Sequence, residues 1–144
     1  MKIAIYGHDK NELNKMKSFL KKYHSEIGQP AIFQYVKDYF PIKTSTGIAK
    51  ILFYDLVYVE VFNKKVSFHM KDGTVKESRT TFSDYEPLLL SHEGFIKTHR
   101  SYIVNLFYME ELTQNAFFTC HKERIPVSRL LYHDVHNKYL DFLS

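Results

Sequence analysis

The residues best suited to chemistry are His99, Arg100 and Ser101, a polar tripeptide inside an apolar run from Phe95 to Asn105. Lys97 lies two residues before the tripeptide. An imidazole, a guanidinium and a hydroxyl together offer a cation and several hydrogen-bond donors, which suit an anionic partner. Because Lys and Arg are almost never fully buried unless they are paired, the pattern predicts a buried strand that surfaces briefly to present these groups. Phe95, Tyr102, Ile103 and Val104 would anchor it, and His99-Arg100-Ser101 would form the exposed turn.

Cations also gather at two other polar breaks between apolar segments. One is Asn63-Lys64-Lys65, and the other runs from Lys122 to Arg124 and leads to Ser128 and Arg129. Loops on a β scaffold commonly carry binding groups. If folding brings the three breaks to one side, Arg would read guanine through O6 and N7, while Lys and Ser would favour phosphates. Ordinary solvation of hairpin turns is the alternative, and composition alone does not separate the two.

Other chemistries find little support in the sequence. A single cysteine, Cys120, leaves no internal disulfide and no zinc site built on several cysteines. His133 and His136 are spaced i, i+3, but neither they nor His69 have a carboxylate or Cys at a ligand spacing. With only five glycines, no phosphate-binding loop or GxSxG motif is present. We therefore expect no metal, no cofactor, no catalytic residue and no enzyme activity.

The elements that must position the three breaks are mostly strands. Aromatic residues make up 16% of the chain and hydrophobic residues 44%, which favours a β-rich core. A long apolar run must be broken near Tyr54-Asp55, and Asp72-Gly73 predicts a two-residue hairpin turn. We expect strands at residues 39–43, 51–62 in two pieces, 66–70, 75–81 at an edge, 95–105, 116–120, and 125–127 at an edge because of Pro126.

Two short helices accompany these strands. Ser83 and Glu86 form a capping box that predicts a helix through residue 90. Ser128 is expected to cap a C-terminal helix, in which Leu131, Val135 and Phe142 share the buried face.

The first 36 residues follow a different pattern. Residues 2–6 and 31–36 resemble strands, and between them Asp9 and Glu12 open a helix with one apolar face. This β-α-β segment holds six lysines against three acidic residues, whereas residues 37–144 hold 14 Lys and Arg against 13 Asp and Glu. We therefore expect two domains, 1–36 and 37–144, and any nucleic-acid contact by the second must come from cations clustered in space.

The run from Phe95 to Asn105, followed by Ile125-Pro126-Val127-Ser128-Arg129, resembles the hallmark of the LytTR DNA-binding domain of bacterial transcription regulators. Asp55 to Glu60 resembles that family's earlier motif, an acidic residue and an apolar pair leading to a Tyr/Phe-x-Glu strand. The resemblance covers residues 37–144. It implies an elongated, mostly antiparallel β fold with short helices, whose loops enter successive major grooves and bend the DNA.

The resemblance also implies which residues touch DNA, and they coincide with the polar breaks. With Lys97 added from the charge pattern, the candidate DNA-binding residues are Asn63, Lys64, Lys65, Lys97, His99, Arg100, Ser101, Ser128 and Arg129.

The N-terminal segment resembles the opening β-α-β of a response-regulator receiver domain. Where a receiver has a pair of acidic metal-binding residues after its first strand, this chain has Gly7-His8-Asp9. The phosphoacceptor strand and the later Lys strand are also missing. We therefore expect no phosphoacceptor and no control by phosphorylation, and we expect the segment to pack on the LytTR domain or on a second copy.

The sequence thus predicts a bacterial, sequence-specific transcription regulator that binds double-stranded DNA, as a homodimer on paired direct repeats. The absence of a signal peptide and of a long apolar run favours a cytoplasmic location. The resemblance further implies a membrane-bound inhibitor protein as a possible partner. The alternative is a protein–protein interaction module that does not bind DNA.

Overall fold

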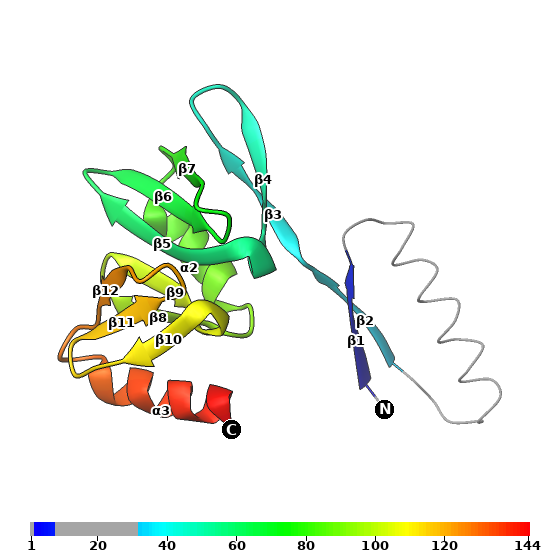
Figure 1. The fold of residues 1–144 in the computed structure, drawn as a ribbon. Helices are drawn as coiled ribbons and strands as arrows, with labels where there is room; N and C mark the ends of the chain where they lie inside the picture. Colours follow the sequence, from blue (N-terminus) through cyan, green and yellow to red (C-terminus); the bar gives the residue numbers. More distant parts are fainter. Residues whose placement is uncertain (1, 8–31) are drawn as a thin grey trace, which may run out of the picture. The chain divides into compact units, whose positions relative to one another are not determined.

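The computed structural model describes residues 2–7 and 32–144 (Figure 1). It divides the chain into two compact units, residues 1–40 and 41–144. In the first unit, β1 (Lys2–Gly7) and β2 (Ile32–Lys37) pair in parallel. The predicted helix falls on residues 8–31, outside the described residues. The β-α-β assignment, its resemblance to a receiver and the domain boundary after residue 36 therefore stay predictions.

The second unit is built on a five-stranded antiparallel sheet with the order β7-β6-β5-β9-β8. Side chains alternate along β6, where Val66, Phe68 and Met70 are buried, as their spacing predicts. The polar strand β7 lies at an edge, also as predicted. The strands are β5 (Leu56–Phe62), β6 (Lys65–Met70), β7 (Val75–Ser78), β8 (Phe95–His99) and β9 (Tyr102–Asn105).

A second antiparallel sheet, ordered β10-β11-β12, packs with helix α3 against one face of the first sheet. Tyr58 and Val104 from the large sheet share a core with Phe117 of the small sheet and with Val135 and Tyr139 of α3. Pro126 lies in the edge strand β12, as predicted. The elements are β10 (Met109–Leu112), β11 (Ala116–Thr119), β12 (Arg124–Pro126) and α3 (Tyr132–Leu143).

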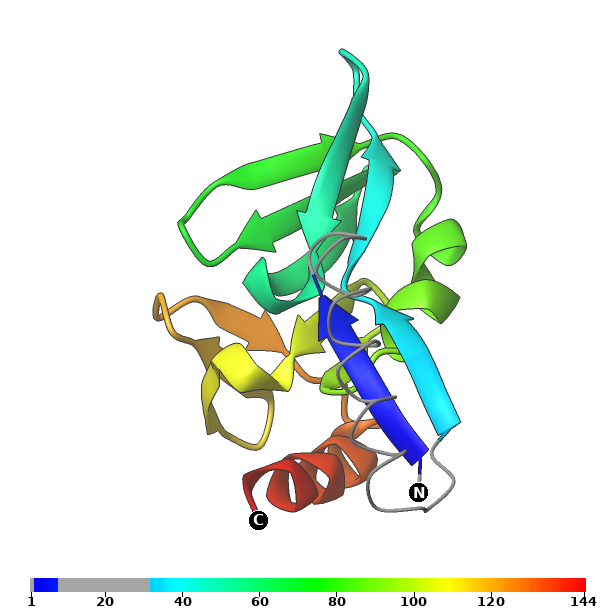
Figure 2. The same cartoon turned by 90° about the vertical axis from the view of Figure 1, so that its right-hand side faces the viewer.

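Helix α2 (Phe82–Leu90) covers the other face of the large sheet (Figure 2). The ring of Tyr85 meets that of Phe68 edge to face, with centroids 5.2 Å apart. In the strand register Phe68 pairs with Val59, whereas His69 pairs with Tyr58, and side chains of successive strand residues point to opposite faces. The antiparallel β architecture with two helices confirms the predicted fold class for this unit.

Several short elements remain, the first of which spans the boundary between the two units. β3 (Tyr39–Lys43) and β4 (Ile48–Leu52) form a two-stranded sheet. The predicted break near Tyr54-Asp55 is a 3-10 turn, η1 (Phe53–Asp55), and a second turn, η2 (Leu106–Tyr108), follows β9.

Several strand predictions need correction. The run from Phe95 to Asn105 is two paired strands rather than one strand, because the predicted turn at His99-Arg100-Ser101 reverses the chain at residues 100–101. The turn at Asp72-Gly73 is longer than two residues: Met70 N donates to Thr74 O at 2.9 Å, and Gly73 has φ +87°. β10 was not predicted, because Met109–Leu112 is too short and too acidic to show a clear alternation.

Both predicted helix caps are wrong. Helix α2 has Thr81 as its N-cap residue, so Ser83 lies inside the first turn. Helix α3 has Leu131 as its N-cap residue. Ser128 instead holds the turn before it, where the amide of Leu131 donates to the Ser128 hydroxyl at 3.2 Å. On α3 the side chain buried with Val135 is Tyr139, four residues on, while Phe142 is 40% exposed.

Candidate nucleic-acid interface

Two of the three polar breaks lie at the same end of the large sheet. Strands β5 and β9 are antiparallel, with Glu60 opposite Tyr102. The end of β5 therefore lies beside the start of β9, which places the β5–β6 turn next to the β8–β9 turn. The amide of Val61 donates to the carbonyl of Ser101 at 3.0 Å, which joins the two turns directly.

The third break lies at the same end because its backbone is hydrogen-bonded to the end of β8. The amide of Ser128 donates to the carbonyl of Thr98 at 2.8 Å, next to His99. Segments more than 60 residues apart in sequence therefore meet in space. We call this region, formed by Asn63, Lys64, His99, Arg100, Ser101, Ser128 and Arg129, the cationic end.

The β5–β6 turn presents Lys64 in an unusual conformation. Asn63 and Lys64 have φ values of 49° and 63°, which fits the type I′ turn that suits the twist of a two-residue hairpin. Asn adopts this left-handed conformation readily, but Lys does not. Both side chains are exposed. Lys65, the next residue, pairs with Glu77 at 3.4 Å.

The β8–β9 turn is held by His99. The amide of Ser101 donates to His99 Nδ1 at 3.1 Å, so in the neutral ring the proton lies on Nε2, which is left as a donor. The ring meets Tyr102 edge to face at 5.7 Å. This bond fixes the turn that exposes Arg100. Within the described part of the chain, neither Arg100 nor Arg129 forms an ion pair.

Lys97 is not brought to the cationic end as a free cation. Its Nζ donates to Glu86 Oε1 of α2 in a close ion pair, and both side chains are partly buried. The pair ties β8 to the helix. The hydroxyl of the neighbouring Thr98 is buried and has no hydrogen-bond partner among the described residues.

Comparison with known proteins identifies the domain. The sequence model of the LytTr DNA-binding domain matches residues 46–139. The chain belongs to the LytTR DNA-binding domain family. One solved structure similar to it is the LytTr DNA-binding domain of a methyl-accepting/DNA response regulator from Bacillus cereus, with 27% identity and a TM-score of 0.58. That match covers 73% of this chain and 98% of the other. No curated protein matches the chain.

Acidic side chains near the cationic end of the LytTR domain are engaged by partners. Glu60 binds His69 Nε2 at 2.8 Å, and His69 stacks on Tyr58 with ring centroids 4.0 Å apart. Glu77 pairs with Lys65, and Glu86 pairs with Lys97, as above. The charges of Glu77 and Glu86 are thus partly neutralised by lysines, so the field at the exposed turns is set mainly by Lys64, Arg100 and Arg129.

Tyr58 links the large sheet to the β11–β12 turn of the LytTR domain. Its hydroxyl donates to Glu123 Oε2 at 2.9 Å. Burial, and then the bond to Glu123, raise the pKa of Tyr58 far above its ordinary value. Tyr58 therefore stays neutral at physiological pH and holds this turn in place.

Sequence reasoning missed Gln114 and Asn115. They lie in the β10–β11 turn and line a hollow together with Val127, Arg129 and Tyr132. The amide of Val127 donates to the carbonyl of Asn115 at 2.8 Å, which fixes the turn beside the Arg129 segment. The turn carries no cation, so charge could not reveal it; the polar triplet from Thr113 to Asn115 between apolar residues was the available signal.

The described residues also bear on a metal site, a membrane span and a reactive thiol. No set of three or more His, Cys, Asp or Glu side chains that could hold a metal occurs among residues 2–7 and 32–144. In the same residues, no helix has the length and apolarity that a membrane crossing requires. Burial raises the pKa of the Cys120 thiol, which disfavours the reactive thiolate.

Proposed function

We propose that this protein is a sequence-specific transcription regulator whose LytTR domain reads base edges with the turns of its cationic end. The observation that carries the proposal is the convergence of three turns that each expose a long cation, held by backbone bonds to neighbouring strands. Arg100 and Arg129 suit bidentate contacts to guanine, and Lys64 suits a phosphate. The Nε2–H of His99 is an additional donor.

The proposal extends to how the domain is used. The turns enter successive major grooves and bend the duplex, and two copies bind paired direct repeats in the cytoplasm of a bacterium. Phosphorylation of the N-terminal segment does not control binding, because Gly7-His8-Asp9 replaces the acidic pair of a receiver. A stable acyl-phosphate on any aspartate after incubation with a phosphodonor would contradict that part. A membrane-bound inhibitor remains a proposed partner, from the family resemblance alone.

Substitution of the two arginines tests base reading. Preferred duplexes are first selected from a random pool, and affinities for selected and random duplexes are then measured by fluorescence anisotropy. Arg100→Ala and Arg129→Ala should each lose about 1–3 kcal/mol of specific binding. Arg100→Lys is the matched control: it keeps the charge but loses the planar fork, so it should bind random duplexes like the wild type and lose discrimination.

Two results would contradict the proposal. If Arg100→Ala binds selected and random duplexes as the wild type does, the base-reading role is wrong. If the wild type enriches no duplex from the pool, the alternative of a protein–protein interaction module is favoured instead.

A further inference from the structure

We propose that Arg79 and Lys43 form a phosphate-holding subsite beside the cationic end, and that it takes a backbone phosphate of the bound duplex. This inference rests on the proposed DNA-binding function and extends it to two residues outside the three turns. The site lies between the edge strand β7 and the tip of the β3–β4 hairpin.

The strand register places Arg79 at the end of the sheet where the three turns lie. Strands β6 and β7 are antiparallel, with Val66 opposite Ser78. β6 begins at Lys65, directly after the Asn63-Lys64 turn. The residue that follows Ser78 therefore leaves the sheet at the same end as Lys64. The ion pair between Lys65 and Glu77 at 3.4 Å bridges the two strands at this end.

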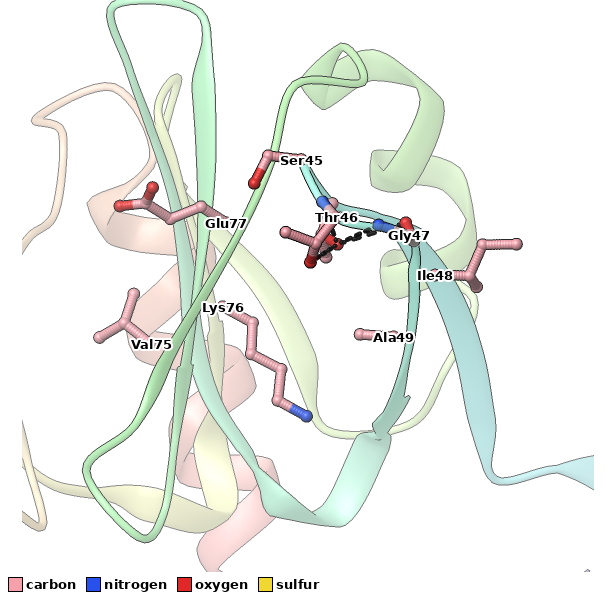
Figure 3. Close-up of a pocket in the computed structure, with 9 residues that line it drawn as sticks. Ser45, Thr46, Gly47, Ile48, Ala49, Val75, Lys76 and Glu77 are labelled. Atoms are coloured by element: carbon pink, nitrogen blue, oxygen red, sulfur yellow. Dashed lines mark hydrogen bonds between the residues drawn. The ribbon is translucent and has the colours of Figure 1, made fainter.

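The β3–β4 hairpin runs along β7 with its tip toward the same end. Lys50 and Leu52 of β4 line one hollow with Thr74 and Val75, near the start of β7. Further along, residues 44–49 face residues 75–77 across a second hollow, where Figure 3 shows Ser45, Thr46 and Gly47 opposite Val75, Lys76 and Glu77. Residues 43–45 then line a third hollow with Arg79 and Thr80.

The lining of this third hollow suits a phosphate. The space is about 280 Å³ and is bounded by Lys43, Thr44, Ser45, Arg79 and Thr80, with no carboxylate among them. The Thr44 hydroxyl is used by the hairpin, where it accepts from the amide of Gly47 at 3.1 Å. Two cations and the hydroxyls of Ser45 and Thr80 remain. Arg, Lys, Ser and Thr are among the side chains that contact phosphate oxygens, and an anion would relieve the repulsion between the two cations.

Its place in the row of cations indicates a phosphate rather than a base. The five strands from β7 to β8 span four strand spacings, about 19 Å in all. A major groove is about 12 Å wide. When the β8–β9 turn with Arg100 occupies a major groove, Arg79 at the opposite edge of the sheet lies beyond the wall of that groove, where the phosphate backbone runs.

Salt dependence of binding tests the subsite in the full chain. Arg79→Ala and Lys43→Ala should each weaken binding to selected and random duplexes by similar factors and should each reduce the slope of log K against log salt by about one unit. The ratio between selected and random duplexes should not change. Lys71→Ala is the matched control, because Lys71 is an exposed lysine in the β6–β7 turn, at the opposite end of the sheet; its slope should match the wild type.

A second arm identifies the source of the phosphate. Duplexes carrying one uncharged methylphosphonate at successive positions are bound to wild type and to Arg79→Ala. One flanking position should weaken the wild type but leave Arg79→Ala unaffected. If inorganic phosphate instead raises the melting temperature of the wild type but not of Arg79→Ala, and no methylphosphonate position distinguishes them, the site holds a free anion and the proposal is overturned.

The two proposals fail in different ways. Unchanged slopes for Arg79→Ala and Lys43→Ala, together with lost discrimination in Arg100→Ala, would overturn the subsite alone. A wild-type protein that binds no duplex would overturn both.

Discussion

Lys64 occupies a backbone conformation that its side chain disfavours. Its φ of 63° places it in the left-handed region, where a Cβ atom crowds the backbone and glycine is free of the penalty. This backbone conformation therefore lowers the free energy of unfolding, and it leaves an exposed cation in the turn next to that of Arg100. This combination is expected where a side chain serves binding rather than folding.

Replacing Lys64 by glycine should separate the two effects. Lys64→Gly should raise the free energy of unfolding by about 1 kcal/mol, because it relieves the left-handed strain. It should also weaken all duplexes similarly and lower the salt slope by about one unit, because a phosphate contact is lost. Chemical denaturation and anisotropy titrations measure the two quantities.

Asn63→Gly is the control in the same turn, because it keeps the cation. Its salt slope should equal that of the wild type. A Lys64→Gly variant that bound DNA normally would remove Lys64 from the interface.

Residue types and spacing predicted the cationic breaks. They did not predict which of the cations there are exposed and which are held in ion pairs. Arg100 and Arg129 fall at the polar centres of motifs with a recognisable pattern, and the structure leaves both exposed. Lys97 has the same charge and lies three residues from Arg100, yet it is bound to Glu86. That pair depends on how α2 packs against β8, which no local pattern encodes.

At the scale of elements, Asn105 joins segments that sequence treats as separate. This buried side chain donates from Nδ2 to the carbonyl of Leu56 at 3.0 Å and accepts from the amide of Phe107 at 3.1 Å. One bond reaches the start of β5 and the other caps the 3-10 turn η2. Asn105 therefore helps fix the register of β9 against β5, and so the position of the β8–β9 turn at the other end of β9.

Loss of this side chain should destabilise the fold. Asn105→Ala leaves a buried carbonyl and an amide without partners, so the free energy of unfolding should fall by about 2–4 kcal/mol. Urea denaturation followed by circular dichroism measures the change. Asn115→Ala, at an exposed turn, should stay within about 0.5 kcal/mol of the wild type. Equal stability of Asn105→Ala and Asn115→Ala would contradict the role given to Asn105.

Strand positions were predictable where alternation was clean, and helix starts were not. Val66, Phe68 and Met70 alternate with polar residues, and the strand lies where they predict. Ser83 and Ser128 had the right types for caps, but Thr81 and Leu131 take those positions. Ser128 is instead drawn to β8 by its own amide, a long-range bond that outweighs local capping preference.

At the scale of the domain, charge is almost balanced but unevenly exposed. Residues 37–144 carry 14 Lys and Arg against 13 Asp and Glu, so overall attraction to DNA is weak. Ion pairs engage acids such as Glu77 and Glu86, while the cations of the three turns stay exposed. Binding must therefore depend on a few local contacts, and the slope of log K against log salt should be set by their small number.

The environment of Tyr58, between the two sheets, predicts how the free energy of unfolding depends on pH. The pKa of Tyr58 is raised in the folded state by burial and by Glu123, whereas an unfolded tyrosine ionises near pH 10, roughly. The folded state thus holds its proton more tightly, and this stabilisation is complete below about pH 10 and is lost as pH rises through the folded pKa.

Tyr58→Phe should flatten that dependence. The free energy of unfolding of the wild type should fall with increasing pH above about pH 10, and that of Tyr58→Phe should fall less steeply. Denaturant titrations from pH 8 to pH 11, roughly, give both curves. Glu123→Gln should keep most of the wild-type slope, because burial, the largest cause of the raised pKa of Tyr58, remains. Identical slopes for wild type and Tyr58→Phe would refute the link.

The three turns are attached to the sheet by backbone groups: the Val61 amide to the Ser101 carbonyl, and the Ser128 amide to the Thr98 carbonyl. Neither bond involves the side chain of Lys64, Arg100 or Arg129. Mutation can therefore exchange these three side chains while each turn keeps its position. During evolution, single substitutions at these positions can change the DNA sequence that is bound while every intermediate variant still folds. Related regulators can therefore bind different target sites with the same architecture.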